Sequence, residues 1–233
     1  MDLAYIDMTA NRGDSIVHRR PAISKFIFTL CIIGGVVMAE GPLELAFLLT
    51  VLGGGYFLAR ISIGKIIHYA FYPAFFSLIF ALFQFSNSFS AGMTVIMKAV
   101  TAAMALLLLV FTTPYPSLFG LLSNFLPQII VDGMFFTYRI FFIMISEVRN
   151  LLTNLKIKGG YHPFRLLTNL KNLAGAIGVL FIHAFELSER MYKILTIRGY
   201  NGRLSVGKKA KLDYPDYILI LFGINVIIMV VLL

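Results

Sequence analysis

Charged residues and cysteines are scarce in this 233-residue sequence. Only 13% of its residues are charged and 59% are hydrophobic, whereas a soluble domain carries about a quarter charged residues. The single cysteine, Cys31, excludes a disulfide within the chain, and the four histidines are scattered along the sequence. The sequence therefore offers no metal-ligand cluster, and its composition predicts an all-α, polytopic membrane protein.

The sequence also lacks a cleavable signal peptide and a phosphate-binding loop for ATP. Residues 1–20 are polar and lack the apolar segment of a secretory signal peptide. No GxxxxGK[ST] loop is present to hold nucleotide phosphates. We therefore expect a protein that is not an enzyme, holds no cofactor and does not hydrolyse ATP by that route.

Long apolar segments are what the sequence has instead. Segments of nearly 20 residues, the length that crosses a bilayer as a helix, fall at about 22–39, 43–59, 66–85, 94–112 and 215–233. Lysine and arginine are present before the first segment and between the second and third, but absent from 39–44 and 86–92. The positive-inside rule then predicts five spans with a cytoplasmic N-terminus. The positions of these spans divide the chain into 1–112 with four spans, a module at 113–213, and a last span at 214–233.

The segment 113–213 is the most basic part of the chain. It holds thirteen Lys/Arg against five Asp/Glu, yet it also contains long apolar patches such as "MFFTYRIFFIMI". These patches are either two more spans or long helices that lie at the cytoplasmic membrane surface, and their periodicity favours the surface helices. Loop topology also explains the net charge of +9 better than nucleic-acid binding does.

Two apolar seams run through this segment with steps that alternate between three and four residues. The first contains Met134, Thr137, Phe141, Met144, Val148, Leu151 and Leu155. The second contains Leu166, Leu170, Leu173, Ile177, Leu180, Ala184, Leu187, Met191 and Ile194. Such spacing predicts two helices that pack closely against another helix.

Both seams end in the same way. The next step after Leu155 falls on Lys158, the next step after Ile194 falls on Arg198, and a glycine follows each cation. Glycine at this position is a common helix stop, and Pro163 suits the first turn of the second helix. The sequence thus predicts a pseudo-repeat of two long helices, each of which finishes Leu-x-Ile-(Lys/Arg)-Gly.

Three stretches carry a resemblance to a known family: "IVHRRPAISKFIFTL", "TYRIFFIMISEVRNLLTNLKIKGGYHP" and "SERMYKILTIRGYNGRL". With the order of spans, they resemble the transmembrane T component of energy-coupling factor (ECF) ABC-type transporters, and most closely the Q subunit of the cobalt/nickel branch. The resemblance covers nearly the whole chain. It implies a multi-pass protein of the plasma membrane, the inner membrane of the cell, that is a scaffold and coupling subunit of an importer.

The family carries one X-Arg-X motif at the end of each of two coupling helices. By resemblance, Ile197, Arg198 and Gly199 form the second motif. The first motif departs from the pattern, because Ile157, Lys158 and Gly159 place a lysine where the family usually has arginine. Lysine keeps the charge but loses the planar, bidentate fork, so it either docks as a point charge or makes the two contacts unequal.

The resemblance also implies the partners. Each motif would enter a groove on one of two copies of a cytoplasmic ABC-type ATPase. A separate substrate-binding membrane component (S or M), with or without a small accessory membrane subunit, would lie in the lipid bilayer; nucleic acid is not an expected partner. Cobalt ranks above nickel on overall resemblance, and a relative that imports a vitamin such as biotin is an alternative. A polytopic membrane enzyme is the alternative from another class, but no catalytic constellation supports it.

Overall fold

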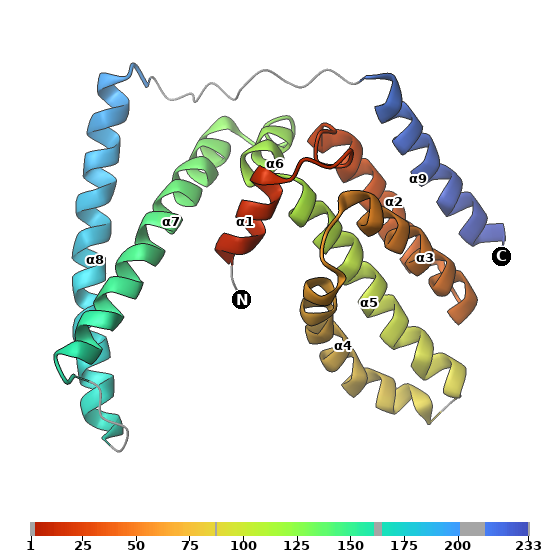
Figure 1. Ribbon diagram of the computed structural model, residues 1–233, viewed down its shortest axis with the longest axis horizontal. Coiled ribbons are helices and arrows are strands. Elements are labelled where there is room, and N and C mark those ends of the chain that lie inside the picture. The colour runs from red at the N-terminus through yellow and green to blue at the C-terminus, as the bar shows by residue number, and fades with distance from the viewer. Residues whose placement is uncertain (1–2, 87, 161–164, 201–212, 233) are drawn as a thin grey trace. The chain divides into compact units, whose positions relative to one another are not determined.

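The structure, a computed structural model, describes residues 3–86, 88–160, 165–200 and 213–232, and every regular element in these ranges is a helix. The predicted all-α class is confirmed. The helices are α1 (Leu3–Arg12), α2 (Ala22–Met38), α3 (Pro42–Ala59), α4 (Ile63–Phe85), α5 (Phe89–Thr112), α6 (Tyr115–Leu122), α7 (Gln128–Ile157), α8 (Leu166–Ile197) and α9 (Tyr214–Leu232) (Figure 1).

Six of the described helices are long and apolar enough to cross a membrane: α3, α4, α5, α7, α8 and α9. The helix α2 is also apolar but has only 17 residues. Length and composition therefore agree with a polytopic protein. They also admit α7 and α8 as spans, although the periodicity of these two helices predicts a surface module.

The chain divides into two compact units, which we call unit 1 (Met1–Leu121 with Lys208–Leu233) and unit 2 (Leu122–Gly207). In unit 1, α5 packs against α2, α3 and α4, and α9 packs against α2. The core contains side chains with no exposed surface, among them Ile32, Leu48 and Phe111. Gly223 brings α9 close to α2, because a Cβ added there would lie 3.3 Å from the Cβ of Cys31.

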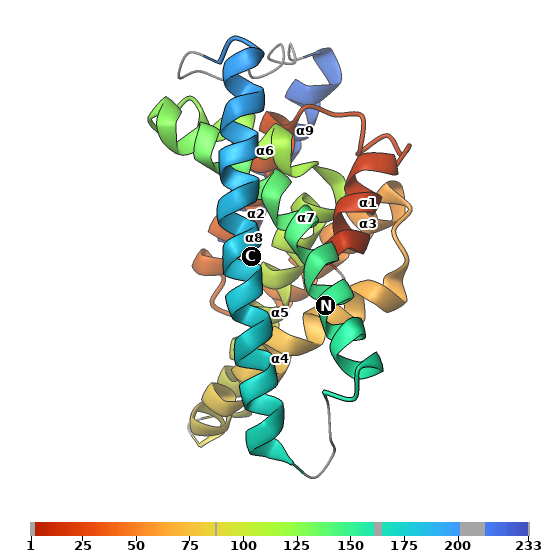
Figure 2. The same cartoon turned by 90° about the vertical axis from the view of Figure 1, so that its left-hand side faces the viewer.

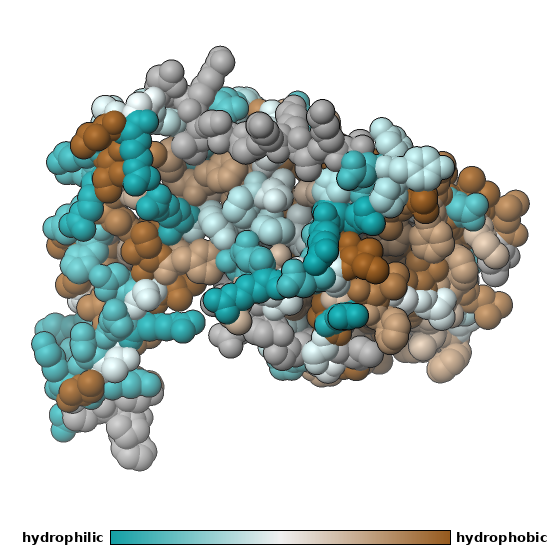
Figure 3. Space-filling model, turned by 45° about the horizontal axis from the view of Figure 1, so that its top comes forward, coloured by the Kyte–Doolittle hydropathy of each residue, from teal (hydrophilic) through white to brown (hydrophobic). Residues whose placement is uncertain are grey.

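The outer surface of unit 1 is strongly apolar. On α4, the side chains of Phe71, Phe75, Phe76, Phe80 and Phe83 are all more than half exposed. Apolar side chains also cover the right-hand part of Figure 3, over α2, α3 and α9. Contiguous apolar patches of this extent are rare on soluble monomers, so this surface fits a lipid solvent.

Two short helices and one helix start were not predicted. Residues 3–12, which the sequence analysis grouped with a polar N-terminal segment, form α1, which contacts α5 and buries Ile6 and Ala10. The helix α6 was not expected within the segment that follows α5. The helix α5 begins at Phe89 instead of 94, because the Ser88 hydroxyl caps its first turn by accepting from the Ala91 N–H at 3.1 Å.

Candidate functional site

The two long helices of unit 2 form an antiparallel hairpin. The chain runs along α7 and returns along α8 (Figures 1 and 2), and the two helices are in contact. Three of these contacts are polar: Asp132 with Tyr200 at 3.0 Å, Glu147 with His183 at 3.8 Å, and Asn172 with Gly160 at 2.6 Å. The C-terminal ends of the two helices consequently lie at opposite ends of the hairpin.

Both helices end in the same backbone motif. Lys158 (φ −77°, ψ 7°) and Arg198 (φ −82°, ψ 7°) are the last residues of near-helical conformation, and Gly159 and Gly199 follow with φ +68° and +81°. The predicted glycine stops are confirmed.

Two hydrogen bonds close each end. At the end of α7, the Gly159 N–H donates to the Lys156 carbonyl (3.1 Å) and the Gly160 N–H to the Leu155 carbonyl (2.9 Å). At the end of α8, the two equivalent bonds measure 3.0 and 2.9 Å. This pair of bonds defines the Schellman motif.

The end of α3 shows that a cation at a helix end need not take this form. There Arg60 itself adopts the left-handed conformation, with φ 54°, and no glycine follows it. At the ends of α7 and α8 the cation instead stays in line with its helix. The repeated arrangement is therefore specific to the hairpin among the described residues.

Each end of the hairpin presents a cation beside an exposed apolar side chain. Ile157 is 77% exposed and Ile197 is 86% exposed, and both Lys158 and Arg198 are exposed. A positive charge at a helix C-terminus is favoured by the helix macrodipole. We call these two ends the Lys158 tip (Ile157–Gly159) and the Arg198 tip (Ile197–Gly199).

The predicted seam residues differ in how exposed their side chains are along the hairpin. On α7, the side chains of Val148, Leu151 and Leu155 are partly buried. On α8, Met191 is 7% exposed, while Leu173, Leu180, Leu187 and Ile194 are partly buried. Leu166, Leu170 and Ile177 are 74%, 62% and 54% exposed.

In the first turns of α8, the face that is least exposed contains Asn169 and Asn172 instead of Leu166 and Leu170. Asn172 donates from Nδ2 to the Gly160 carbonyl, which holds this face toward the hairpin turn. The packing role of the seam as a whole stays a prediction. Pro163, expected in the first helical turn, and His162 lie outside the described residues.

Two polar side chains in unit 1, the buried Lys25 and the partly buried His18, were missed by the sequence reasoning, which used the cations before the first segment only to orient the spans. Lys25 is 4% exposed, and its Nζ donates to the Thr112 carbonyl at 2.6 Å and to the His18 carbonyl at 3.3 Å. His18 Nε2 lies 3.2 Å from the Phe111 carbonyl. The last carbonyls of α5, which have no partner within the helix, are thus held by Lys25 and His18.

The contacts of His18 define its tautomer. Because the Phe111 carbonyl can only accept, Nε2 carries the proton, and Nδ1 accepts from the Ser15 hydroxyl at 2.6 Å. Burial, followed by the positive charge of Lys25, lowers the pKa of His18 below its usual value. His18 is consequently neutral at pH 7.

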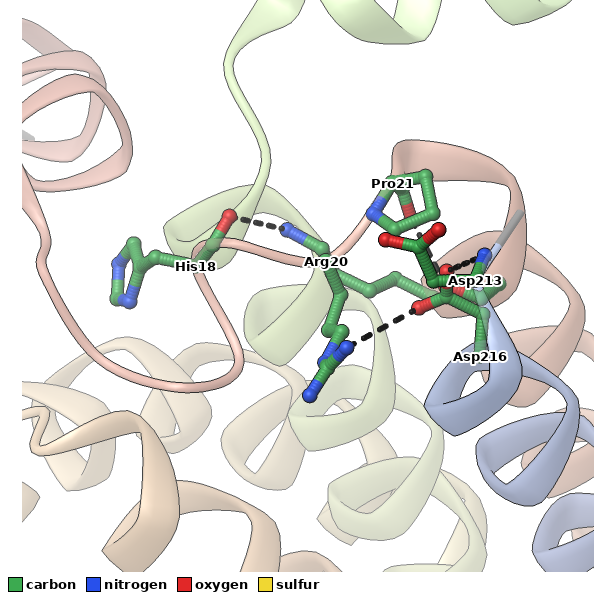
Figure 4. Close-up of polar contacts among 7 residues, drawn as sticks. His18, Arg20, Pro21, Asp213 and Asp216 are labelled. Atoms are coloured by element: carbon green, nitrogen blue, oxygen red, sulfur yellow. Dashed lines mark hydrogen bonds and ion pairs between the residues drawn. The ribbon is translucent and has the colours of Figure 1, made fainter. Parts of the chain in front are cut away.

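A buried carboxylate fixes the start of α9 in unit 1. Asp216 is 1% exposed, and its Oδ2 accepts from the Asp213 N–H at 2.8 Å. Its Oδ1 has no hydrogen bond but lies 3.9 Å from the Arg20 guanidinium (Figure 4). Arg20, which the sequence reasoning used only for topology, therefore joins the segment before α2 to α9.

Two other charged side chains in the described ranges contact neighbouring groups. Lys98 of α5 donates to the Val37 carbonyl at the end of α2 at 3.4 Å. Glu189 pairs with Lys193 on the exposed surface of α8. Within the described ranges, no three His, Cys, Asp or Glu side chains come close enough together to hold a metal ion.

Comparison with known proteins matches residues 13–208 to the family described as CbiQ, cobalt transport protein. The chain is 28% identical over 106 residues to the cobalt transport protein CbiQ of Salmonella typhimurium, covering 45% of this chain and 46% of that protein. Two uncharacterized proteins of Methanocaldococcus jannaschii are also similar. MJ1089 is 25% identical over 62% of this chain and 54% of its own length, and MJ1571 is 24% identical over 46% and 36%.

The chain thus spans about half the length, or less, of the named relatives it matches. The family match is broader, because it begins in the segment before α2 and extends past the Arg198 tip. The apolar helices agree with the membrane location that a transport family requires. This multi-pass membrane protein belongs to the CbiQ cobalt transport protein family.

Proposed function

We propose that this chain is the transmembrane coupling subunit, or T component, of an ATP-driven ECF importer for cobalt ions. It lies in the plasma membrane with its N-terminus in the cytoplasm. The Lys158 tip and the Arg198 tip each hold one copy of a cytoplasmic ABC-type ATPase, which hydrolyses the ATP. A separate substrate-binding membrane component binds the ion and receives the movement.

The duplicated tip is the observation that carries this proposal. Two chemically similar ends with the same backbone geometry, at opposite ends of one hairpin, suit two copies of one partner. The length of α8, 32 residues, separates the tips by roughly 48 Å at 1.5 Å per residue. One small partner cannot occupy both ends at that separation.

The chemistry of each tip suits a groove that contains a carboxylate. A charge-assisted hydrogen bond between a cation and a carboxylate is about twice as strong as a neutral one. Burial of an isoleucine that was exposed adds about 1.5–3 kcal/mol. Lys158 offers a point charge and Arg198 a planar fork, so we infer that the Arg198 tip makes the stronger contact.

The family description and the printed name of one relative support cobalt as the cargo. Nickel, and a vitamin such as biotin, are the alternatives. Uptake of labelled cobalt, nickel and biotin by cells that express the complete transporter distinguishes them. Genes for an ATPase and for a small metal-binding membrane protein next to this one favour a metal ion.

The docking role is tested by alanine substitutions at the two tips. Removal of one partner of a buried charge-assisted contact costs about 2–5 kcal/mol. Arg198→Ala therefore weakens co-purification of the ATPases and lowers ion uptake, Lys158→Ala does so more mildly, and the double variant is worse than either. Lys158→Arg, which restores the usual residue of the family, keeps both activities.

Arg149→Ala is the matched control, because Arg149 is an exposed arginine on α7 away from the tips. It leaves ATPase capture and uptake at the level of the parent protein. If Arg198→Ala also captures the ATPases and transports like the parent, then Arg198 only ends a helix and the docking role is wrong.

A further inference from the structure

The Arg198 tip is tied to the beginning of α7 by a buried carboxylate. Asp132 is 1% exposed, although it carries a charge-bearing side chain on an otherwise apolar turn of α7. Its Oδ2 accepts from the Tyr200 hydroxyl at 3.0 Å, and its Oδ1 accepts from Gln128 Nε2 at 2.8 Å. The Tyr200 ring also meets the Phe136 ring edge-on, with the centroids 5.7 Å apart.

Tyr200 is held by its backbone as well as by its side chain. Its N–H donates to the Leu195 carbonyl at 2.9 Å as part of the Schellman motif. Arg198 therefore lies between two fixed points, the last turn of α8 and the side chain of Tyr200. Partial burial, then the hydrogen bond to Asp132 and the charge of Asp132, raise the pKa of the Tyr200 phenol, so the hydroxyl stays a donor at neutral pH.

The Lys158 tip is held in a different way. The residue that corresponds to Tyr200 is Gly160, which has no side chain, and its carbonyl accepts from Asn172 Nδ2 at 2.6 Å. In both cases a side chain near the beginning of one helix holds the end of the other. At the Lys158 tip the link is an amide to a backbone carbonyl, whereas at the Arg198 tip a buried carboxylate receives two side-chain donors.

We propose that Asp132, Gln128 and Tyr200 form a brace that orients Arg198 at its ATPase contact and passes movement of the Arg198 tip to the beginning of α7. The three are positioning residues, since they act through Arg198, and their role rests on the proposed docking function. Leaving a buried carboxylate without one of its hydrogen-bond donors costs free energy. The hydrogen bonds of the brace therefore stay intact when the ATPase moves the tip.

The first measurement reports on the brace without any ATPase. Spin labels are attached at Ile129→Cys and Thr196→Cys, two exposed positions near this end of the hairpin, in the purified full-length protein with Cys31→Ala. Tyr200→Phe keeps the ring against Phe136 but removes the hydroxyl, and it broadens the distance distribution between the labels. A second pair, Asn154→Cys with Lys171→Cys near the Lys158 tip, keeps its distribution.

Tyr192→Phe is the matched control, because Tyr192 is a tyrosine of α8 that is 67% exposed. It removes the same hydroxyl without changing either distribution. A distribution for Ile129 and Thr196 that Tyr200→Phe leaves as narrow as the parent overturns the brace, whether or not ATPases bind to the protein.

The second measurement uses the transporter assembled with its ATPases and its substrate-binding component. Tyr200→Phe raises the ATP hydrolysed per ion transported by about fivefold, the factor that corresponds to the loss of one net hydrogen bond, while the ATPases still co-purify. If Tyr200→Phe broadens the distance distribution between the labels but leaves the ATP hydrolysed per ion unchanged, the positioning role is wrong. If the parent protein fails to capture the ATPases, the docking function is wrong instead. The spin-label measurement separates the two cases, because it reports on the brace without any ATPase.

Discussion

At the scale of single residues, unit 1 depends on side chains that donate to the carbonyl groups at the end of a helix. Lys25 and His18 both reach the last carbonyls of α5, which carry the negative end of the helix macrodipole. A lysine that is 4% exposed needs such partners, because an unpaired charge is very costly to bury. His18 completes the arrangement only as the neutral tautomer with the proton on Nε2.

The stability of unit 1 should therefore fall in mild acid. The folded state holds the pKa of His18 below the usual value of about 6.5, so the unfolded chain binds a proton first as the pH drops. The thermal unfolding midpoint in detergent should decrease as the pH falls from about 7.5 through 6.5. The decrease should end once the pH is below the lowered pKa of folded His18.

His18→Gln is the control for this pH dependence, since glutamine can donate to the Phe111 carbonyl but does not titrate. This variant should lose most of the dependence between about pH 7.5 and 6. An equal decrease in parent and variant would show that another group is responsible.

At the scale of helices, the sequence predicts ends better than faces. A helix stop depends on the few residues around it, so Gly159 and Gly199 could be identified from the pattern alone. The face that α8 turns toward α7 depends on the partner helix. Apolar spacing therefore predicted Leu166 and Leu170 for this face, whereas the least exposed side chains in the first turns of α8 include Asn169 and Asn172.

The two glycine stops should be sensitive to the smallest side chain. Gly199→Ala and Gly159→Ala each place a Cβ on a left-handed residue, a cost of roughly 1–2 kcal/mol. Both variants should show faster hydrogen–deuterium exchange in the last turn of the affected helix and weaker ATPase capture. Circular dichroism should show a lower unfolding temperature.

Gly178→Ala provides a comparison of opposite sign. Gly178 is inside α8, and a Cβ added there meets no atom within 4 Å. Alanine should stabilise the helix at this position by about 0.5–1 kcal/mol. A Gly199→Ala protein that gains stability in the same way would contradict the conformational strain assigned to the tip.

At the scale of the whole molecule, the apolar helices of unit 1 were predictable and the links between distant segments were not. Five segments of the sequence correspond to α2, α3, α4, α5 and α9 because twenty apolar residues form a local signal. Asp132 and Tyr200 are 68 residues apart, and Lys25 and Thr112 are 87 residues apart. No local pattern indicates such pairs, since only the folded backbone brings them together.

The membrane topology distinguishes two interpretations of the hairpin. Docking of ATPases at both tips requires both tips in the cytoplasm, whereas a hairpin that crosses the bilayer places them on opposite sides. In cells that express the Cys31→Ala protein, an impermeant thiol reagent should label Ser90→Cys from outside. Lys156→Cys and Thr196→Cys should react only after the cells are permeabilised.

Each of these three positions is exposed in the structure, so a lack of labelling reports on the side of the membrane. Labelling of Lys156→Cys from outside, with Thr196→Cys protected, would establish α7 and α8 as spans. It would also exclude docking of cytoplasmic ATPases at both tips.

Two lysines that donate to carbonyl groups near helix ends restrict the movement of α2 against α5. Lys25, near the start of α2, binds the last carbonyl of α5, and Lys98 of α5 binds the Val37 carbonyl near the end of α2. The two antiparallel helices are thus linked at both ends of α2, each time by a lysine of one helix that donates to a terminal carbonyl of the other. If α2 slid along α5 by a single turn, about 5.4 Å, both hydrogen bonds would break at once. Sliding of α2 along α5 is therefore disfavoured, and we expect the two helices to move together as one body.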